Sequence, residues 1–296
     1  MQSKQLYLLN LMTILIIFVW GITFVSTKVL ILEGLTPAEI FTERFCIALV
    51  GLWILCPKPL TSGSLKDEFM LFLAGITGGS LYFVTENTAL AITYASNVSL
   101  LICLAPIFTL ILARIFLGTK VTLFQVMGSL LAYVGVWLVV FNGQFRLIDN
   151  NIGDALAIAA ALSWAFYCLL IKKLSERYST LFITRQVFLY ALISQLLFFL
   201  YDPTIFHFEL LTKPIVWGNL LFLSLIGSLL CFIGWSHAVK ELGAAKTANY
   251  IYLTPLFTLC AAAVCLSEPI TVWMIGGGAC ILLGVFIVEK SKAPAN

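Results

Sequence analysis

One acidic residue, Glu86, stands well inside a long apolar stretch of the sequence. An ionisable side chain at the centre of a membrane helix costs roughly 2.5–3.5 kcal/mol, so it usually lines a cavity or pairs with another group. Glu86 could hold an ammonium group or a proton, or it could pair with Lys28 or Arg44. Asn87 beside it adds a neutral hydrogen-bonding group. These residues predict a polar site inside an otherwise apolar protein.

Two tryptophans, Trp20 and Trp164, form a second group of candidates. They occupy corresponding positions in two apolar segments, each eight residues before a lysine. A buried tryptophan needs a partner for its N–H group, and in a bilayer it favours an interface or a wet cavity. The sequence leaves two interpretations equally open for this pair, the lining of a cavity and plain packing.

Charged residues open the apolar segment 38–56, namely Glu39, Glu43 and Arg44. The dipole of a helix stabilises acids in its first turn, which is one explanation of this pattern. The other is an electrostatic gate that these charges form with Lys28 at the outer mouth of a pathway. Both explanations remain open at this point.

Two prolines, Pro106 and Pro255, lie within apolar segments. Each lacks a backbone N–H and therefore frees the carbonyl four residues earlier, at Ile102 and Ile251. We take both prolines as candidate hinges, with a fixed bend needed for packing as the alternative.

The composition explains the surroundings of these residues. The chain has 296 residues, of which 61% are hydrophobic and only 10% charged. A soluble domain carries about 25% charged residues, so these charges cannot cover a globule of this size. Soluble and disordered proteins are therefore excluded, and the net charge of +3 gives no reason to expect nucleic acid as a partner.

Metal, cofactor and enzyme chemistry find no support in the sequence. The eight cysteines all fall in apolar stretches, and no Cys/His pairing has the spacing of a zinc site. The chain has no phosphate-binding loop of the Walker type, so ATP is not expected to be a direct energy source. We expect no metal, no cofactor and no catalytic residue.

Apolar stretches separated by short polar or proline-containing breaks predict ten membrane-spanning helices. A spanning helix needs about 20 mostly apolar residues. The fold class that follows is an all-α integral membrane protein. The predicted spans are 8–31, 38–56, 69–91, 97–117, 121–141, 153–173, 182–201, 216–238, 246–266 and 270–289.

Lysine and arginine residues in the short connections predict the orientation, because they concentrate on the cytoplasmic side. With the N-terminus inside, 13 of the 17 fall on the cytoplasmic side and 4 on the outer side. This distribution supports the ten spans and predicts that both termini are cytoplasmic.

An internal repeat divides the chain into two halves. Sliding the sequence by 149 residues aligns 89–140 with 238–289 without a gap and matches the two prolines. An offset of 144 matches the two tryptophans. The halves, 8–141 and 153–289, would each hold five helices, and because five is odd the second half must enter the membrane inverted. Inverted repeats are the architecture of many secondary transporters.

Motifs of the two halves add a family resemblance. Each half has Leu-Ala-Pro or Leu-Thr-Pro followed by Phe-Thr-Leu, and a Gly-x6-Gly pattern closes each half. The second half also has the polar segment Ser267-Glu268-Pro269. Together with the early Trp20-Gly21, this pattern resembles the EamA-type members of the drug/metabolite transporter superfamily. The first half departs from it, with Gly118-Thr119-Lys120 where the family usually has Gly-Glu.

The resemblance implies a central pathway surrounded by helices 1, 3, 4, 6, 8 and 9. We expect that pathway to be lined by side chains from most of these helices. The candidates are Trp20, Tyr82, Glu86, Asn87, Trp164, Tyr167, Trp235 and Tyr252.

The resemblance also implies a function. We expect a secondary transporter in the inner membrane of a bacterium, which exports a small molecule, above all an amino acid, by alternating access. The lipid bilayer and the substrate are its expected partners, and coupling to protons is left open. Drugs, organic cations and nucleotide sugars are the alternative substrates. A channel, a sensor or an intramembrane transferase are the alternatives outside transport.

Overall fold

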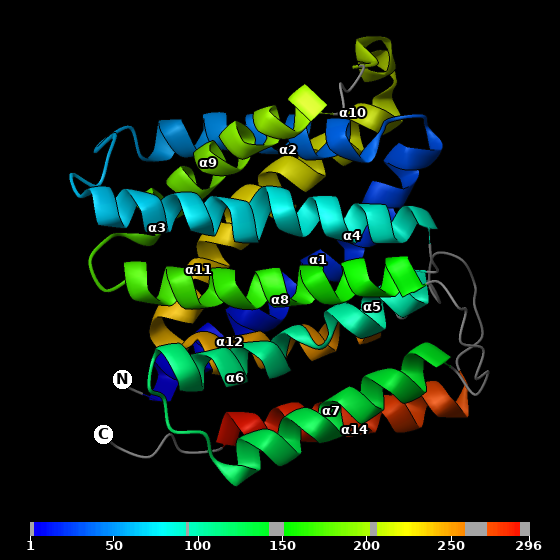
Figure 1. The fold of residues 1–296 in the computed structure, drawn as a ribbon. Helices are drawn as coiled ribbons and strands as arrows, with labels where there is room; N and C mark the ends of the chain where they lie inside the picture. The colour runs from blue at the N-terminus through cyan, green and yellow to red at the C-terminus, as the bar shows by residue number, and fades with distance from the viewer. Residues whose placement is uncertain (1–2, 93–94, 142–150, 202–205, 258–270, 291–296) are drawn as a thin grey trace.

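The computed structural model describes residues 3–92, 95–141, 151–201, 206–257 and 271–290, and no strand occurs in these ranges. The helices lie side by side and run between two ends of the molecule (Figure 1). The described helical segments occupy most of each predicted span as far as residue 257 and again from residue 272, with a turn at Cys103 and Leu104 inside the span 97–117. The rest of the predicted span 246–266 lies outside the described residues.

The first half of the chain contains long helices and two interrupted ones. The segment from α3 to α4 is helical without a break and contains a π-helical stretch, η1. The elements are α1 (Ser3–Leu32), α2 (Pro37–Leu55), α3 (Leu65–Gly75), η1 (Ile76–Ser80), α4 (Leu81–Ile92), α5 (Ala95–Ile102), α6 (Ala105–Phe116) and α7 (Leu123–Phe141).

The second half follows a similar order. A longer π-helical stretch, η3, again lies in the middle of its third long helical segment. The elements are α8 (Asn151–Leu174), α9 (Thr180–Tyr201), η2 (Phe208–Thr212), α10 (Pro214–Leu221), η3 (Phe222–Leu230), α11 (Cys231–Leu242), α12 (Ala244–Ala248), the 3-10 helix η4 (Asn249–Leu253) and α14 (Val272–Lys290).

Within the described ranges, six helical segments are long and apolar enough to cross a membrane by length and composition. Two shorter apolar helices, Leu100–Phe116 and Thr180–Leu196, accompany them. The described structure therefore gives an all-helical protein with several apolar helices, and the full count of ten spans stays a prediction. The six segments are Lys4–Leu32, Leu65–Ala89, Leu123–Phe141, Ile152–Leu174, Pro214–Leu242 and Val272–Lys290.

The described ends of the first and last helices lie at the same end of the molecule. The start of α1 and the end of α14 are found there, together with the connections α2–α3 and α8–α9 (Figure 1, left). The turn between α1 and α2 lies at the opposite end. Which end faces the cytoplasm stays a prediction from the charges.

Local sequence signals explain where several helices begin and end. Thr36 caps α2 with its side chain, and the Glu39 carboxylate accepts a hydrogen bond from the Thr36 backbone N–H in return. Pro37 follows at the first helical position, where its missing N–H costs nothing. Gly243 ends α11 with a φ of 89°, a conformation that favours glycine, and the chain reverses into α12.

Both candidate hinge prolines follow a break in the α-helix. The turn at Cys103 and Leu104 separates α5 from α6, and Pro106 occupies the first turn of α6. Pro255 comes directly after the 3-10 helix η4. Pro106 therefore lies in the first turn of α6, where its ring meets no preceding α-helical turn, whereas a 3-10 turn precedes Pro255. The role of both prolines as hinges stays a prediction.

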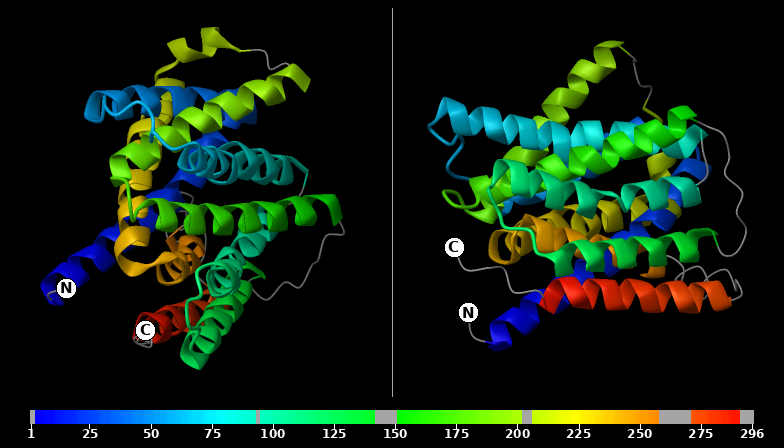
Figure 2. Two further views of the ribbon diagram at one scale, coloured as in Figure 1. Left: turned by 60° about the vertical axis from the view of Figure 1, so that its left-hand side comes forward. Right: turned by 60° about the horizontal axis from the view of Figure 1, so that its bottom comes forward.

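Glycines bring α7 and α14 into close contact. A Cβ atom on Gly135 would lie 2.6 Å from the Gly277 carbonyl oxygen, and one on Gly284 would lie 2.5 Å from that of Gly128. The Gly-x6-Gly patterns therefore let two backbones approach each other, as small residues do in membrane helix pairs. This pair forms one edge of the molecule, away from α2 and α9 (Figures 1 and 2).

The contact predicts a position-specific loss of stability. Gly277→Leu should lower the free energy of unfolding by about 1–3 kcal/mol, because the added side chain meets the Gly135 carbonyl and Val139. The measurement is the monodisperse fraction of detergent-solubilised protein that survives heating. Gly276→Leu is the matched control, since nothing lies within 4 Å of its Cβ position. Equal losses in the two variants would contradict the assigned packing.

Candidate functional site

An aromatic cluster surrounds Trp164, a buried residue of α8. Its ring centroid lies 5.4 Å from that of Trp20 in α1 and 5.1 Å from that of Tyr82 in α4. From α11, Trp235 and Phe232 lie at 5.8 Å and 5.9 Å. Tertiary packing thus gathers side chains from both halves of the chain around one tryptophan. We call this group, with Tyr167, the aromatic cluster.

Several polar atoms of the aromatic cluster are buried and have no hydrogen-bond partner among the described residues. They are Nε1 of Trp164, the hydroxyl of Tyr167 and Nε1 of Trp235. The Ser236 hydroxyl lies near the Tyr167 hydroxyl, and the Cys168 thiol lies near Nε1 of Trp235. Neither pair has the geometry of a hydrogen bond. An unpaired buried polar group costs about 1–3 kcal/mol, so these atoms favour a polar ligand or water between them.

Glu86 lies at the edge of the aromatic cluster and is 5% exposed. The Tyr82 hydroxyl donates to its Oε1 at 3.1 Å. Arg44 from α2 is equally buried and interacts electrostatically with Glu86, but the two form no direct ion pair in the described residues. The Arg44 Nε donates to the Ser228 hydroxyl, and its guanidinium carbon lies 5.2 Å from the centre of the Phe83 ring. A buried acid and a buried base therefore stand close to one aromatic surface.

The remaining predicted site residues are Tyr252, Asn87, Glu43 and Lys28. The Tyr252 hydroxyl faces Ser129 of α7, and its ring makes no contact with the cluster among the described rings. Asn87 is half-buried next to Glu86 on α4. One carboxylate oxygen of Glu43 is buried and has no hydrogen-bond partner within the described ranges, and the side chain of Lys28 lies outside what the structure describes. The assignment of these residues to a pathway or its mouth stays a prediction.

Two glycines that the sequence analysis did not single out touch the same region. A Cβ on Gly78 in η1 would collide with the Tyr167 ring, and one on Gly227 in η3 would lie 2.8 Å from Thr23. The Trp20 Nε1 donates to the Gly227 carbonyl oxygen at 2.9 Å. The repeat offset of 149 that aligns 89–140 with 238–289 also brings Gly78 onto Gly227, so the signal was present in the sequence.

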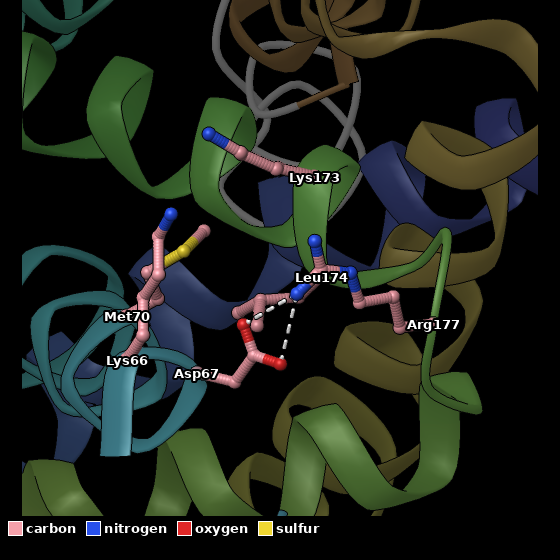
Figure 3. Close-up of a pocket in the computed structure, with 6 residues that line it drawn as sticks. All are labelled: Lys66, Asp67, Met70, Lys173, Leu174 and Arg177. Carbon is pink, nitrogen blue, oxygen red and sulfur yellow. Dashed lines mark hydrogen bonds and ion pairs between the residues drawn. The ribbon is translucent and has the colours of Figure 1, made fainter. Parts of the chain in front are cut away.

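Polar contacts tie the helices together at both ends of the molecule. At one end, Arg177 Nη1 bonds the two carboxylate oxygens of Asp67 at 3.0 and 3.1 Å, as Figure 3 shows. The Tyr178 hydroxyl donates to the same carboxylate at 2.8 Å, which raises the pKa of Tyr178. At the opposite end, Lys213 pairs with Glu33 at 2.7 Å. The small pocket at the first contact is lined by Lys66, Asp67, Met70, Lys173, Leu174 and Arg177.

Known proteins resemble this chain along most of its length. It is 28% identical over 276 residues to an uncharacterised transporter of Archaeoglobus fulgidus, covering 92% of this chain and 95% of the relative. It is 30% identical over 280 residues to a probable terminal-alkyne amino-acid exporter of Streptantibioticus cattleyicolor, covering 94% and 92% of the two chains. A crystal structure of a protein at 16% identity shares the fold, with a TM-score of 0.77 over 95% of this chain and 98% of the other.

The model of the EamA-like transporter family matches residues 8–141 and, a second time, residues 151–289. These matches cover most of the chain and confirm the resemblance that its motifs indicated. With its long apolar helices, the chain is a membrane protein that belongs to the EamA-like transporter family.

Proposed function

We propose that this protein is a secondary transporter that exports a small amino-acid-like metabolite across a bacterial cell membrane by alternating access. The observation that carries the proposal is the aromatic cluster, in which side chains from both halves meet around Trp164 beside the buried Glu86. Binding sites for small molecules are mostly apolar with a few placed polar groups, and this cluster has that character. The relative named as an amino-acid exporter supports the substrate class.

The proposal includes ten spans arranged as two inverted five-helix halves, 8–141 and 153–289. Contacts of equivalent residues support it. An offset of 144 places Thr23 on Tyr167, and an offset of 149 places Gly78 on Gly227. The close contacts of Gly78 with Tyr167 and of Gly227 with Thr23 therefore correspond to each other. Two similar halves can exchange conformations, which turns the pathway from one side of the membrane to the other.

One contact of the two halves differs, and we propose that this difference marks the state of the transport cycle. The Trp20 Nε1 donates to the Gly227 carbonyl, whereas Nε1 of the equivalent Trp164 is buried and has no partner in the described part of the chain. In the opposite state Trp164 would donate to the carbonyl of Gly78, and Trp20 would be released. Pro106 and Pro255, which follow equivalent breaks in the helices, are the proposed hinges of this exchange.

Reconstituted protein provides the test of transport. Liposomes loaded with unlabelled amino acids should accumulate a labelled amino acid by counterflow, with and without a pH gradient. Trp164→Ala should reduce the rate by about tenfold or more, because truncation of a central buried aromatic group typically costs 2 kcal/mol or more in binding. Glu86→Gln should reduce it as well, and should abolish any dependence on the pH gradient if Glu86 carries the proton.

Trp273→Ala is the matched control for this experiment. Trp273 is 47% exposed on α14 and lies outside the aromatic cluster, so its truncation should leave counterflow unchanged. The same liposomes are tested with organic cations and nucleotide sugars. Transport of either class without any amino acid would refute the proposed substrate. Absence of counterflow for all three classes would refute the proposed transport.

The tryptophan exchange predicts opposite effects of two similar variants. Trp20→Phe removes the hydrogen bond of the present state and should shift the protein toward the other state. Trp164→Phe removes the bond expected in that other state and should shift the protein back. Hydrogen–deuterium exchange of the connections at the two ends of the molecule measures the shift, and the sign of the change at each end should be opposite in the two variants.

The double variant with both phenylalanines controls for the loss of the indole groups themselves. It should restore an exchange pattern close to that of the unmodified protein, because it weakens both states. Changes of the same sign in both single variants would contradict the proposed exchange.

A further inference from the structure

We infer that the substrate of the proposed transporter is bound as a zwitterion, with its carboxylate on Arg44 and its ammonium group on Glu86. This inference rests on the proposed function and names the chemistry of the same site. It comes from two buried, oppositely charged side chains that lie near each other without direct contact, next to the aromatic cluster.

Arg44 presents terminal hydrogen-bond donors that no group in the described residues accepts from. Its side chain is buried, at 5% exposure, and within the described part of the chain only Nε makes a hydrogen bond, to the Ser228 hydroxyl. The Phe83 ring lies against the guanidinium group, with its centroid 5.2 Å from the guanidinium carbon. A guanidinium group with free terminal N–H groups in an apolar surround is costly, and its planar fork matches a carboxylate. The missing partner is therefore an anion of carboxylate geometry.

Glu86 offers the complementary charge. Its Oε1 accepts from the Tyr82 hydroxyl at 3.1 Å, and no hydrogen bond to its Oε2 occurs among the described residues. Arg44 and Glu86 influence each other electrostatically, but no nitrogen of the former reaches an oxygen of the latter within ion-pair distance in the described structure. A ligand that carries both charges would supply hydrogen-bond partners to Arg44 and to Glu86. By lying between the two side chains, it would also account for the absence of a direct ion pair.

The aromatic cluster continues from this pair and provides a place for the apolar part of the ligand. The Tyr82 ring lies 5.2 Å from that of Phe83 and 5.1 Å from that of Trp164. It therefore connects the charged pair with the tryptophans. Aromatic faces also attract an ammonium group, which adds to the effect of Glu86. An α-amino acid with an apolar side chain meets all three requirements.

The repeat does not explain the charged pair. At the offset of 149, the position that corresponds to Glu86 is occupied by Trp235. The acid is thus present in one half only, although its surroundings are shared. An asymmetric pair of charges in a site built by two similar halves is what an asymmetric ligand with unlike ends requires.

Binding of matched analogues to the purified protein tests the inference. The probes are L-leucine and L-phenylalanine, their methyl esters, which keep the ammonium group, and 4-methylpentanoate and 3-phenylpropanoate, which keep the carboxylate. The ligand-dependent rise in melting temperature gives the apparent affinity. At least one amino acid should bind about 10- to 100-fold more tightly than both of its analogues, because each analogue leaves a buried charge without its partner. An ester or a des-amino acid that binds as tightly as its parent amino acid overturns the inference.

Two variants assign the charges to the two ends of the ligand. In Glu86→Gln, the amino acid should lose its advantage over the des-amino acid and keep its advantage over the ester. In Arg44→Gln, the opposite loss is expected, and Arg44→Lys, which keeps the charge, should recover part of it. Glu176→Gln and Arg114→Gln are the controls, because they remove the same kinds of charged group at exposed positions. A purely structural role of the pair would weaken all probes alike and overturns the assignment.

The outcome separates this inference from the proposed function. Counterflow of amino acids together with equal binding of all analogues leaves the transporter standing and refutes the zwitterion site. If Arg44→Gln does not fold, the analogue series on the unmodified protein still decides. Binding of no probe at all refutes the inference, and with absent counterflow it refutes the proposed function as well.

Discussion

The free-energy cost of burying a polar atom without a hydrogen-bond partner is the constraint on which the rest of this structure depends. With 61% of its residues hydrophobic, the chain offers few partners inside its core, and a bilayer offers none outside. Many hydroxyls return to their own helix, as Thr13 and Thr109 do by donating to the carbonyl four residues earlier. Among the described residues, buried polar atoms without a hydrogen-bond partner occur in the aromatic cluster, as at Trp164 and Trp235, and outside it, as at Glu43. Three such atoms gather in the aromatic cluster, at Trp164, Tyr167 and Trp235, and this local concentration supports the proposal of a binding region there.

Two kinds of helix contact support this region in different ways. Between α7 and α14, glycines let the backbones of two regular helices pack directly against each other at one edge of the molecule. In η1 and η3, glycines lie in π-helical stretches beside the aromatic cluster. Single π-helical turns are frequent at functional sites, because they shift a helix without breaking it. The pair α7 and α14 thus packs away from the aromatic cluster, whereas η1 and η3 lie beside it.

Much of the architecture could be predicted because it depends on local properties. Apolar length, short polar breaks and helix caps such as Thr36 act within a few residues, so the helices occur where they were expected. The sequence analysis expected Pro106 inside a helix, whereas a turn precedes it. The resemblance placed Tyr252 on the pathway, and this stays a prediction, although its hydroxyl lies near Ser129 of α7. Such differences arise where the rotation of a helix about its axis decides the environment of a side chain.

By itself, the sequence determined an apolar, helical membrane protein with an internal repeat, a family, and a short set of unusual residues, including Glu86 and the two matched tryptophans. These features follow from composition, from the periodicity of apolar residues and from the spacing of motifs. Only the tertiary structure decided that Trp164 lies at the centre of the cluster, and that Arg44 approaches Glu86 without pairing with it. Those relations depend on distances between helices that are far apart in the chain, and packing of the whole bundle sets such distances.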